Sequence, residues 1–321
     1  MITVAGEALI DLVDEGGGRY RAHPGGSPAN VAVGLARLDV PCSLLGRVST
    51  DALGGQLAAH LAGNGVSLRD VVRAAEPTTL ALASLDAAGQ AAYSFYVQGT
   101  ADWQWRRGEL PRALAPDVAA VHAGSLALAL EPGASVLEEL LAAERARGKV
   151  TISLDPNIRP QLAGSRAAEA ARVERQIRLA HLVKASEDDI AWLYPGRAAE
   201  AVARDWQRLG PGLVVVTLGG EGAYALAPDG TGIRRPARPV RVVDTVGAGD
   251  AFCAGLLDSL WRGGHLGPDA EQRLGGLTAA GLAEILDWAG LVAALTCERP
   301  APTPRPARKL SRPGNRHRRE P

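Results

Sequence analysis

A glycine-rich turn followed by an aspartate lies near the far end of the chain, at Asp244-Thr245-Val246-Gly247-Ala248-Gly249-Asp250, and leads into an apolar run that predicts a helix. A glycine turn that opens a helix presents backbone N–H groups, at the positive end of the helix dipole, to an anion. A carboxylate beside a bound anion is repulsive unless it accepts a proton from a nucleophile that attacks that anion. We therefore predict phosphoryl transfer, with Asp250 as base and the amides of Gly247, Ala248 and Gly249 as the anion hole. The alternative is an ordinary loop-to-helix junction in which Asp250 is a capping residue.

The composition is that of an ordinary globular protein: 321 residues, of which 46% are hydrophobic and 22% charged. This length suits one large α/β domain or two smaller ones. The three cysteines, Cys42, Cys253 and Cys297, lie far apart, match no metal-site spacing and predict no disulfide framework. We expect a reducing compartment, the cytoplasm, because the first residues also lack the pattern of a signal peptide. No run approaches the roughly 18 apolar residues that span a membrane, so none is expected to do so.

A net charge of zero conceals a basic end. Residues 300–321 hold six arginines and one lysine against one glutamate, a net charge of +6, so the other residues sum to −6. The stretch is rich in proline and nearly free of apolar side chains, so we assign residues 1–300 to the folded unit and 301–321 to a disordered tail. A basic tail can contact nucleic acid, but a solvated extension is the simpler interpretation. The acidic remainder argues against nucleic-acid binding elsewhere.

Extended runs alternate with helical segments along the body of the chain. This predicts an α/β fold with a mostly parallel central sheet and helices on both faces. The extended runs are residues 2–13, 43–48, 118–124, 150–155, 181–186 and 213–219. Two stretches, approximately residues 12–24 and 78–105, are predicted strands without intervening helices, and Asp86-Ala87-Ala88-Gly89 is a predicted hairpin turn. We expect a small antiparallel β lid that excludes water from a pocket, with a plain edge hairpin as the alternative.

Two common nucleotide-binding motifs are absent from the sequence. The only Gly-Lys pair, Gly148-Lys149, is followed by valine, so there is no Gly-x-x-x-x-Gly-Lys-[Ser/Thr] loop. No Gly-x-Gly-x-x-Gly follows a predicted strand. These absences argue against a P-loop NTPase and against a standard dinucleotide-binding fold.

A second glycine cluster lies in the N-terminal half, where Gly25-Gly26 precedes Asn30 at the head of a small-residue helix. The glycines let a ligand approach the backbone, and the Asn30 amide offers a donor and an acceptor to a polyol. Together with Glu7, Asp11 and the later segment Gly46–Gly54, this cluster resembles the PfkB (ribokinase-like) family of carbohydrate kinases. The resemblance covers about residues 1–300 and is closest to the fructokinase-type members.

The family's second signature, Asp-Thr-x-Gly-Ala-Gly-Asp, is matched by Asp244–Asp250. The resemblance implies a ribokinase-like fold and an ATP-dependent sugar kinase that phosphorylates a primary hydroxyl. It also implies that Asp11 accepts hydrogen bonds from sugar hydroxyls, and that Gly26 and Asn30 line the same pocket.

A further match is Asp155-Pro156-Asn157-Ile158-Arg159-Pro160, which resembles the family's Asp-Pro-Asn-x-Arg segment and follows a predicted strand. The resemblance places Arg159 near the substrate, where ligands of α/β sheets bind beyond the strand ends. For Asp155 and Asn157 a simple turn before Pro160 is an equal alternative.

On the nucleotide side, Lys184-Ala185-Ser186-Glu187 matches a segment where many relatives have Asn-x-x-Glu. The resemblance implies that Glu187 organises Mg²⁺ and phosphate through water. Lys184 is similar to what fructokinase-type members carry there, and a lysine adds positive charge near the phosphates. The turn from Thr217 to Gly222 resembles the one that holds ATP. Its expected contacts are Thr217, Gly219 and Gly222, joined by Gly249, and the alternative is a strand-to-hairpin turn.

Two departures lie near the C-terminus. Gly290 stands where many relatives carry asparagine near the adenine, and Arg299-Pro300-Ala301-Pro302 lacks a glycine often found there. In several members this region and the neighbourhood of Asp244 supply carbonyls to a monovalent cation, so K⁺ is a further expected ion.

The segment from Phe95 to Trp105 is both polar and aromatic, where a lid would reach back to the substrate, and Gln98 is its expected sugar contact. Thr100-Ala101-Asp102 is similar to a Ser-Ala-Asp segment of fructokinase-like members, which favours a fructokinase. 2-Keto-3-deoxygluconate kinase and ribokinase are the alternatives, and a nucleoside kinase is a more distant one. A catalytically silent sugar or nucleotide sensor is the alternative from another class. The exposed edges of a lid also favour a homodimer.

Overall fold

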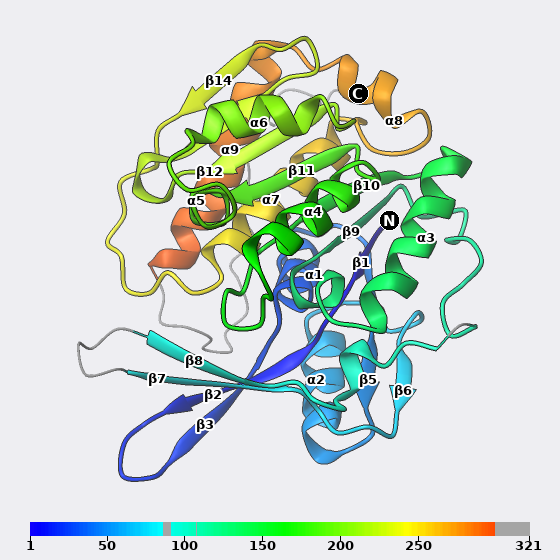
Figure 1. The fold of residues 1–321 in the computed structure, drawn as a ribbon, viewed down its shortest axis with the longest axis vertical. Helices are drawn as coiled ribbons and strands as arrows, with labels where there is room; N and C mark the ends of the chain where they lie inside the picture. Colours follow the sequence, from blue (N-terminus) through cyan, green and yellow to red (C-terminus); the bar gives the residue numbers. More distant parts are fainter. Residues whose placement is uncertain (86–90, 107, 299–321) are drawn as a thin grey trace, which may run out of the picture.

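A computed structural model of the chain describes residues 1–85, 91–106 and 108–298 (Figure 1). Its centre is an eight-stranded sheet in the order β14-β13-β12-β11-β10-β9-β1-β4. Six of these strands, β4, β1, β9, β10, β11 and β12, run parallel to one another. At the edge beyond β12, β13 and β14 each pair antiparallel with the preceding strand. These strands are β1 (Ile2–Ala5), β4 (Cys42–Leu45), β9 (Ala120–Gly124), β10 (Thr151–Asp155), β11 (Leu182–Ser186), β12 (Leu213–Thr217), β13 (Ala223–Leu226) and β14 (Gly232–Arg235).

Helices cover both faces of this sheet, as the alternating pattern predicts (Figure 1). One face packs against α1 (Ser27–Arg37), α2 (Ala52–Gly63), α7 (Ala248–Arg262), α8 (Ala270–Gly275) and α9 (Ala279–Cys297). The other packs against α3 (Gly133–Arg147), α4 (Arg166–Ile177), α5 (Glu187–Leu193) and α6 (Ala199–Gln207). Burial on both faces explains the continuous apolar sequence of β12, because Val215 belongs to one core and Val214 and Val216 to the other.

Among the described residues, α9 is the one helix long and apolar enough to cross a membrane. Its side chains Leu282, Ile285 and Leu286 are buried in the same core as α7. A core helix passes the same length and composition test, and this packing accounts for the apolar character of α9.

A second, four-stranded sheet in the order β3-β2-β7-β8 projects from the main sheet. It contains β2 (Leu9–Asp14), β3 (Tyr20–Gly25), β7 (Leu80–Leu85) and β8 (Ala91–Tyr96), and we call it the lid sheet. Each outer pair is antiparallel, whereas β2 and β7 run parallel to each other. The predicted turn at residues 86–89 and the predicted tail at 301–321 lie outside the described residues.

The first predicted strand, residues 2–13, is two strands in two different sheets. Gly6 ends the run in the main sheet with a φ of 151°, and a Cβ there would lie 2.4 Å from Cγ of Pro28. The chain then turns through Glu7 and Ala8 into the lid. Apolar periodicity continues through this turn, which is why the sequence alone shows one strand instead of two.

Short elements complete the fold: β5 (Arg47–Ser49) pairs with β6 (Val72–Ala74), and single 3₁₀ turns lie at Ala101–Trp103, Ser125–Leu128 and Gly219–Glu221. The carboxyl ends of β10, β11 and β12 are adjacent and end at Asp155, Ser186 and Thr217. Ligands of parallel α/β sheets bind beyond such ends.

Candidate active site

The glycine-rich turn opens α7 as predicted. Gly247 caps the helix with a φ of 77°, a left-handed conformation that favours glycine. Amides in the first turn of a helix have no acceptor within the helix, and the dipole adds positive charge there. The Ala248 N–H donates to the Thr245 carbonyl at 3.1 Å, so this amide is already used within the turn. Gly249 is exposed beside it.

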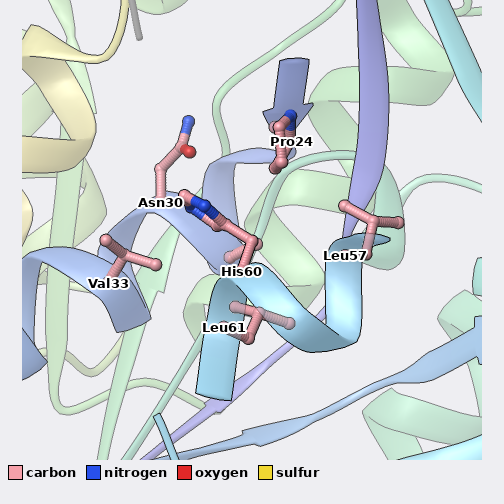
Figure 2. Close-up of a pocket in the computed structure, with 8 residues that line it drawn as sticks. Pro24, Asn30, Val33, Leu57, His60 and Leu61 are labelled. Carbon is pink, nitrogen blue, oxygen red and sulfur yellow. The ribbon is translucent and has the colours of Figure 1, made fainter. Parts of the chain in front are cut away.

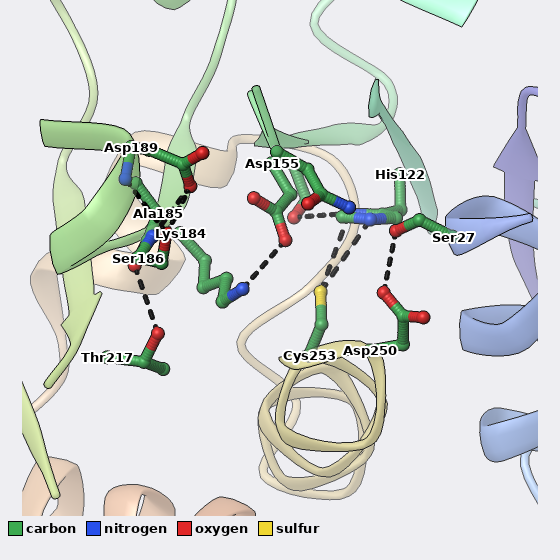
Figure 3. Close-up of polar contacts among 12 residues, drawn as sticks. Ser27, His122, Asp155, Lys184, Ala185, Ser186, Asp189, Thr217, Asp250 and Cys253 are labelled. Atoms are coloured by element: carbon green, nitrogen blue, oxygen red, sulfur yellow. Dashed lines mark hydrogen bonds and ion pairs between the residues drawn. The ribbon is translucent and has the colours of Figure 1, made fainter. Parts of the chain in front are cut away.

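Asp250 lies in the first turn of α7, and its carboxylate contacts the helix of the other glycine cluster. Oδ1 accepts a 2.6 Å hydrogen bond from the Ser27 hydroxyl (Figure 3). Oδ2 accepts a 2.9 Å hydrogen bond from Nδ2 of Asn30. Burial raises the pKa of Asp250, while these two hydrogen bonds and nearby Lys184 oppose that rise. A raised pKa suits a proton acceptor that works near neutral pH.

Asp11 lies close enough to Asp250 for the two charges to interact. Burial raises the pKa of Asp11 to about 6, with a further contribution from Asp250, and Arg159 opposes the rise. Gly25 is required beside Asp11, because a Cβ at Gly25 would lie 2.0 Å from Oδ2 of Asp11. The structure therefore brings together three predicted groups: Asp11, Arg159 and Asp250.

Gly26 caps α1 with a φ of 97°, and a Cβ there would lie 2.8 Å from the Glu7 carbonyl oxygen. Pro28 follows at the start of the helix, where its missing N–H costs no hydrogen bond. Behind this turn, a narrow groove lies between α1 and α2, and it has no room for a water molecule. Figure 2 shows Asn30 at this groove with its amide extending away from Leu57 and Leu61 of α2.

Lys184 and Asp155 form a buried ion pair at the ends of neighbouring strands, with 2.8 Å between Nζ and Oδ2 (Figure 3). Only 4% of Lys184 is exposed, and the adjacent Asp155 carboxylate raises its pKa despite the opposing effect of burial. A Cβ at Gly249 would lie 3.4 Å from the same Nζ. The lysine charge therefore lies beneath the first turn of α7.

The segment after β10 is fixed by Asp189 of α5. Oδ1 of Asp189 accepts a 2.7 Å hydrogen bond from the Ile158 N–H, and Oδ2 closes a capping box with Ser186. Asn157 has a left-handed φ of 42°, and its Oδ1 accepts a 2.6 Å hydrogen bond from Nη1 of Arg159. The turn that was the alternative interpretation of Asn157 thus also orients Arg159. Glu187 is the first residue of α5 and is exposed.

The predicted ATP turn follows β12. Thr217 ends that strand and donates a hydrogen bond to the Ala185 carbonyl at 3.4 Å. Gly219 and Gly222 have positive φ values of 53° and 103°, and a Cβ at Gly222 would lie 2.1 Å from the Arg235 carbonyl oxygen. The segment is therefore a strand-to-hairpin turn, since it connects β12 with β13, and Gly219 in it is exposed.

Gln98 is exposed, in the segment after β8, and among the described residues no hydrogen bond joins it to Asp11 or Asp250. Sequence reasoning did not single out Ser27, although it directly follows the paired glycines. It also missed a buried polar row beneath α7. There His122 is hydrogen-bonded to Ser153 at 3.0 Å and lies 3.6 Å from Sγ of Cys253, and burial lowers its pKa to about 3. No motif marked these residues.

The chain is similar to proteins of a known family. The model of the pfkB family carbohydrate kinases matches residues 1–308. The fructokinase of Rhizobium leguminosarum bv. trifolii is 36% identical over 264 residues, which cover 81% of this chain and 79% of that protein.

Two solved structures are similar throughout. Fructokinase with bound ATP from Xylella fastidiosa has a TM-score of 0.85 at 29% identity, with 93% and 92% of the two chains covered. A fructokinase double mutant from Vibrio cholerae O395, bound to fructose, ADP and a potassium ion, has a TM-score of 0.79 at 29% identity, also with 93% and 92% covered. The chain therefore belongs to the pfkB family of carbohydrate kinases and is a phosphotransferase that acts on a sugar hydroxyl.

Proposed function

We propose that the protein transfers the γ-phosphoryl group of ATP to a primary hydroxyl of fructose, with Asp250 as the general base. The observation that carries this proposal is the pair of hydrogen bonds from Ser27 and Asn30 to Asp250. They hold this carboxylate between the glycine-rich starts of α7 and α1. The start of α7 suits a phosphate, and the start of α1 suits a polyol. The fructokinases named above support fructose as the acceptor.

In this proposal, Asp11, Gly26 and Asn30 hold the sugar, with Gln98 reaching it from the segment after β8. Asp250 takes the proton of the attacking hydroxyl, and the oxygen attacks the γ-phosphorus in line. The bond to the β,γ-bridging oxygen breaks, and ADP leaves with the electron pair. Phosphoryl transfer requires mainly positioning and charge stabilisation. In the proposal, the amides of Gly247 and Gly249, with Lys184 beneath the turn, supply that stabilisation, while the Ala248 amide is used within the turn.

The ATP side of the site consists of Lys184, Glu187, Thr217, Gly219 and Gly222. The carboxylates of Asp155 and Glu187 suit a Mg²⁺ ion. Oδ1 of Asp155 is a buried oxygen without a hydrogen-bond partner among the described residues. Oxygen ligands and retained water are what Mg²⁺ prefers. We infer that Asp155 and, through water, Glu187 hold the ion, which supplies positive charge to the phosphates.

K⁺ is the second ion of the proposal. The Val243 and Asp244 N–H groups both donate to the Cys297 carbonyl, at 2.8 and 3.2 Å, which joins the loop before α7 to the end of α9. Turnover in K⁺ and in Na⁺, at equal ionic strength, tests this part. Equal rates in both salts would contradict it.

The decisive experiment measures ADP release from Mg-ATP with fructose, ribose, 2-keto-3-deoxygluconate and adenosine. Fructose is expected to give the highest kcat/KM. A higher value for 2-keto-3-deoxygluconate or ribose would replace fructose and keep the kinase mechanism. Turnover with none of them, together with measurable sugar or nucleotide binding, would favour a catalytically silent sensor.

Two further parts of the proposal concern assembly and the tail. Exposed aromatic side chains lie on the lid sheet, where Tyr20 is 49% and Tyr96 58% exposed, and we infer that a second copy covers this sheet. Sedimentation should show a dimer that Tyr96→Glu weakens, and a wild-type monomer at all concentrations would contradict it.

Residues 1–300 form the kinase unit in the cytoplasm, and removal of residues 303–321 should leave turnover unchanged.

A further inference from the structure

The two segments through which the chain enters the lid sheet meet at Asp102. The chain enters the lid through Gly6–Ala8 and Thr79, and it leaves after β3 and β8. Oδ1 of Asp102 accepts a 2.9 Å hydrogen bond from the Ala8 N–H, and Oδ2 accepts a hydrogen bond from the Thr79 hydroxyl. Asp102 is 3% and Thr79 0% exposed. One buried carboxylate thus ties together the starts of β2 and β7.

The segment that carries Asp102 is itself anchored. Nη1 of Arg47, which is 2% exposed, donates a 2.9 Å hydrogen bond to the Ala101 carbonyl, and the Ala101 N–H donates to the Pro77 carbonyl at 2.9 Å. Nε1 of Trp103 donates to the Val97 carbonyl at 2.8 Å. Thr100-Ala101-Asp102, the segment that is similar to fructokinase-like members, is therefore buried where the lid sheet joins the main body. The Asp102 carboxylate in it contacts a backbone N–H and a hydroxyl.

The backbone that Asp102 holds is the same backbone on which the sugar-side residues rest. A Cβ at Gly26 would lie 2.8 Å from the Glu7 carbonyl oxygen and 3.2 Å from Cα of Ala8, so the paired glycines pack directly against this turn. Asp11 follows Ala8 by three residues along β2. A shift of Ala8 would therefore move Asp11 and the Gly26 turn relative to Asp250.

We propose that Asp102 is a positioning residue for the sugar, which acts through the Ala8 N–H and the Thr79 hydroxyl to fix where Asp11 lies relative to Asp250. The inference rests on the proposed function, because it assigns Asp11 to the sugar. The proposed ATP contacts lie on β11, α5, β12 with the turn after it, and α7, and the hydrogen bonds of Asp102 join none of these elements. Loss of this anchor should therefore weaken sugar binding selectively.

The buried surroundings support such a role. Glu7, 1% exposed, lies near Asp102 and accepts a 3.1 Å hydrogen bond from the Ala127 N–H. Burial raises the pKa of Glu7 to about 7, and the nearby Asp102 charge adds to this rise. Burial also raises the pKa of Asp102 to about 6, and the Arg47 charge opposes that rise. A buried carboxylate without its hydrogen bonds is costly, so Asp102 should hold both partners firmly.

The test compares Thr79→Val, which removes the hydroxyl with little change in volume, with Thr79→Ser, which keeps it. A hydrogen bond to a charged group is worth enough that Thr79→Val should raise the KM for fructose on the order of ten-fold. The KM for ATP, and kcat at saturating sugar, should stay within about two-fold, because uniform ground-state binding of one substrate is lost. Thr79→Ser should match the wild type.

A second variant guards against a folding defect in the first. Asp102→Asn keeps an acceptor for Ala8 and can donate to Thr79, so its KM for fructose should lie between those of wild type and Thr79→Val. An unchanged KM for fructose in Thr79→Val and Asp102→Asn, or an equal rise in both KM values, would overturn the inference. A wild type that phosphorylates no sugar would instead overturn the proposed function.

Discussion

The Ser27 hydroxyl donates a 2.6 Å hydrogen bond to Oδ1 of Asp250, although the two residues are 223 positions apart in the chain. The contact joins the start of α1 to the first turn of α7. A hydroxyl that donates to a carboxylate favours its charged form, which is the form a base needs. Ser27 therefore tunes the group on which the proposed chemistry depends.

Ser27→Ala should shift the acidic limb of the kcat/KM profile to higher pH. The hydrogen bond from Ser27 opposes the burial that raises the pKa of Asp250, so its removal raises that pKa further. Activity on the acidic limb, relative to activity on the plateau, should fall on the order of ten-fold. Ser27→Thr keeps the hydroxyl and should retain the wild-type profile. Identical pH profiles for wild type and Ser27→Ala would remove Asp250 as the titrating base.

Asp250→Asn should abolish most turnover while sugar still binds. A positioned base contributes about 10²–10⁴-fold, so kcat should fall by at least that range. Asparagine keeps an oxygen for the Ser27 hydroxyl, which preserves the join between α1 and α7. Calorimetry with fructose checks binding, and ADP release checks turnover. A variant with near-normal kcat would show that another group accepts the proton.

Gly25→Ala should weaken sugar binding through Asp11. The added Cβ would lie 2.0 Å from Oδ2 of Asp11, so the carboxylate must move. We expect the KM for fructose to rise on the order of ten-fold, the effect of about 1.4 kcal/mol. Gly55→Ala is the matched control, because it lies in α2 with nothing within 4 Å of the added methyl group. Equal KM values for the two variants would place Asp11 outside the sugar pocket.

Lys184→Met should destabilise the fold and raise the KM for ATP. The substitution leaves the buried Asp155 carboxylate without its ion-pair partner, a change that costs about 3–5 kcal/mol. Urea unfolding measures this loss. The double variant Lys184→Met/Asp155→Asn removes both charges and should recover most of the stability, but not the affinity for ATP. Full recovery of both would assign the pair a purely structural role.

Much of the site was predictable because it rests on local rules. Gly247 needs a left-handed φ to open α7, and only residue types next to it in sequence decide that. The alternation of apolar runs similarly predicted a sheet covered on both faces. The failure at Gly6 has the same origin: hydrophobic periodicity cannot show that one extended run changes sheets, because β1 and the first two residues of β2, Leu9 and Ile10, are all buried.

By itself, the sequence determined the elements and the chemistry each one brings: amides at a helix start, a carboxylate behind them and a polyol-binding turn. Only the tertiary structure decided which groups meet, such as Ser27 with Asp250, Lys184 with Asp155 and Asp102 with Ala8. The physical reason is that these hydrogen bonds and ion pairs act over a few ångströms between side chains far apart in sequence. Their partners are set by the order of strands in the sheet and by the packing of α1 against α7.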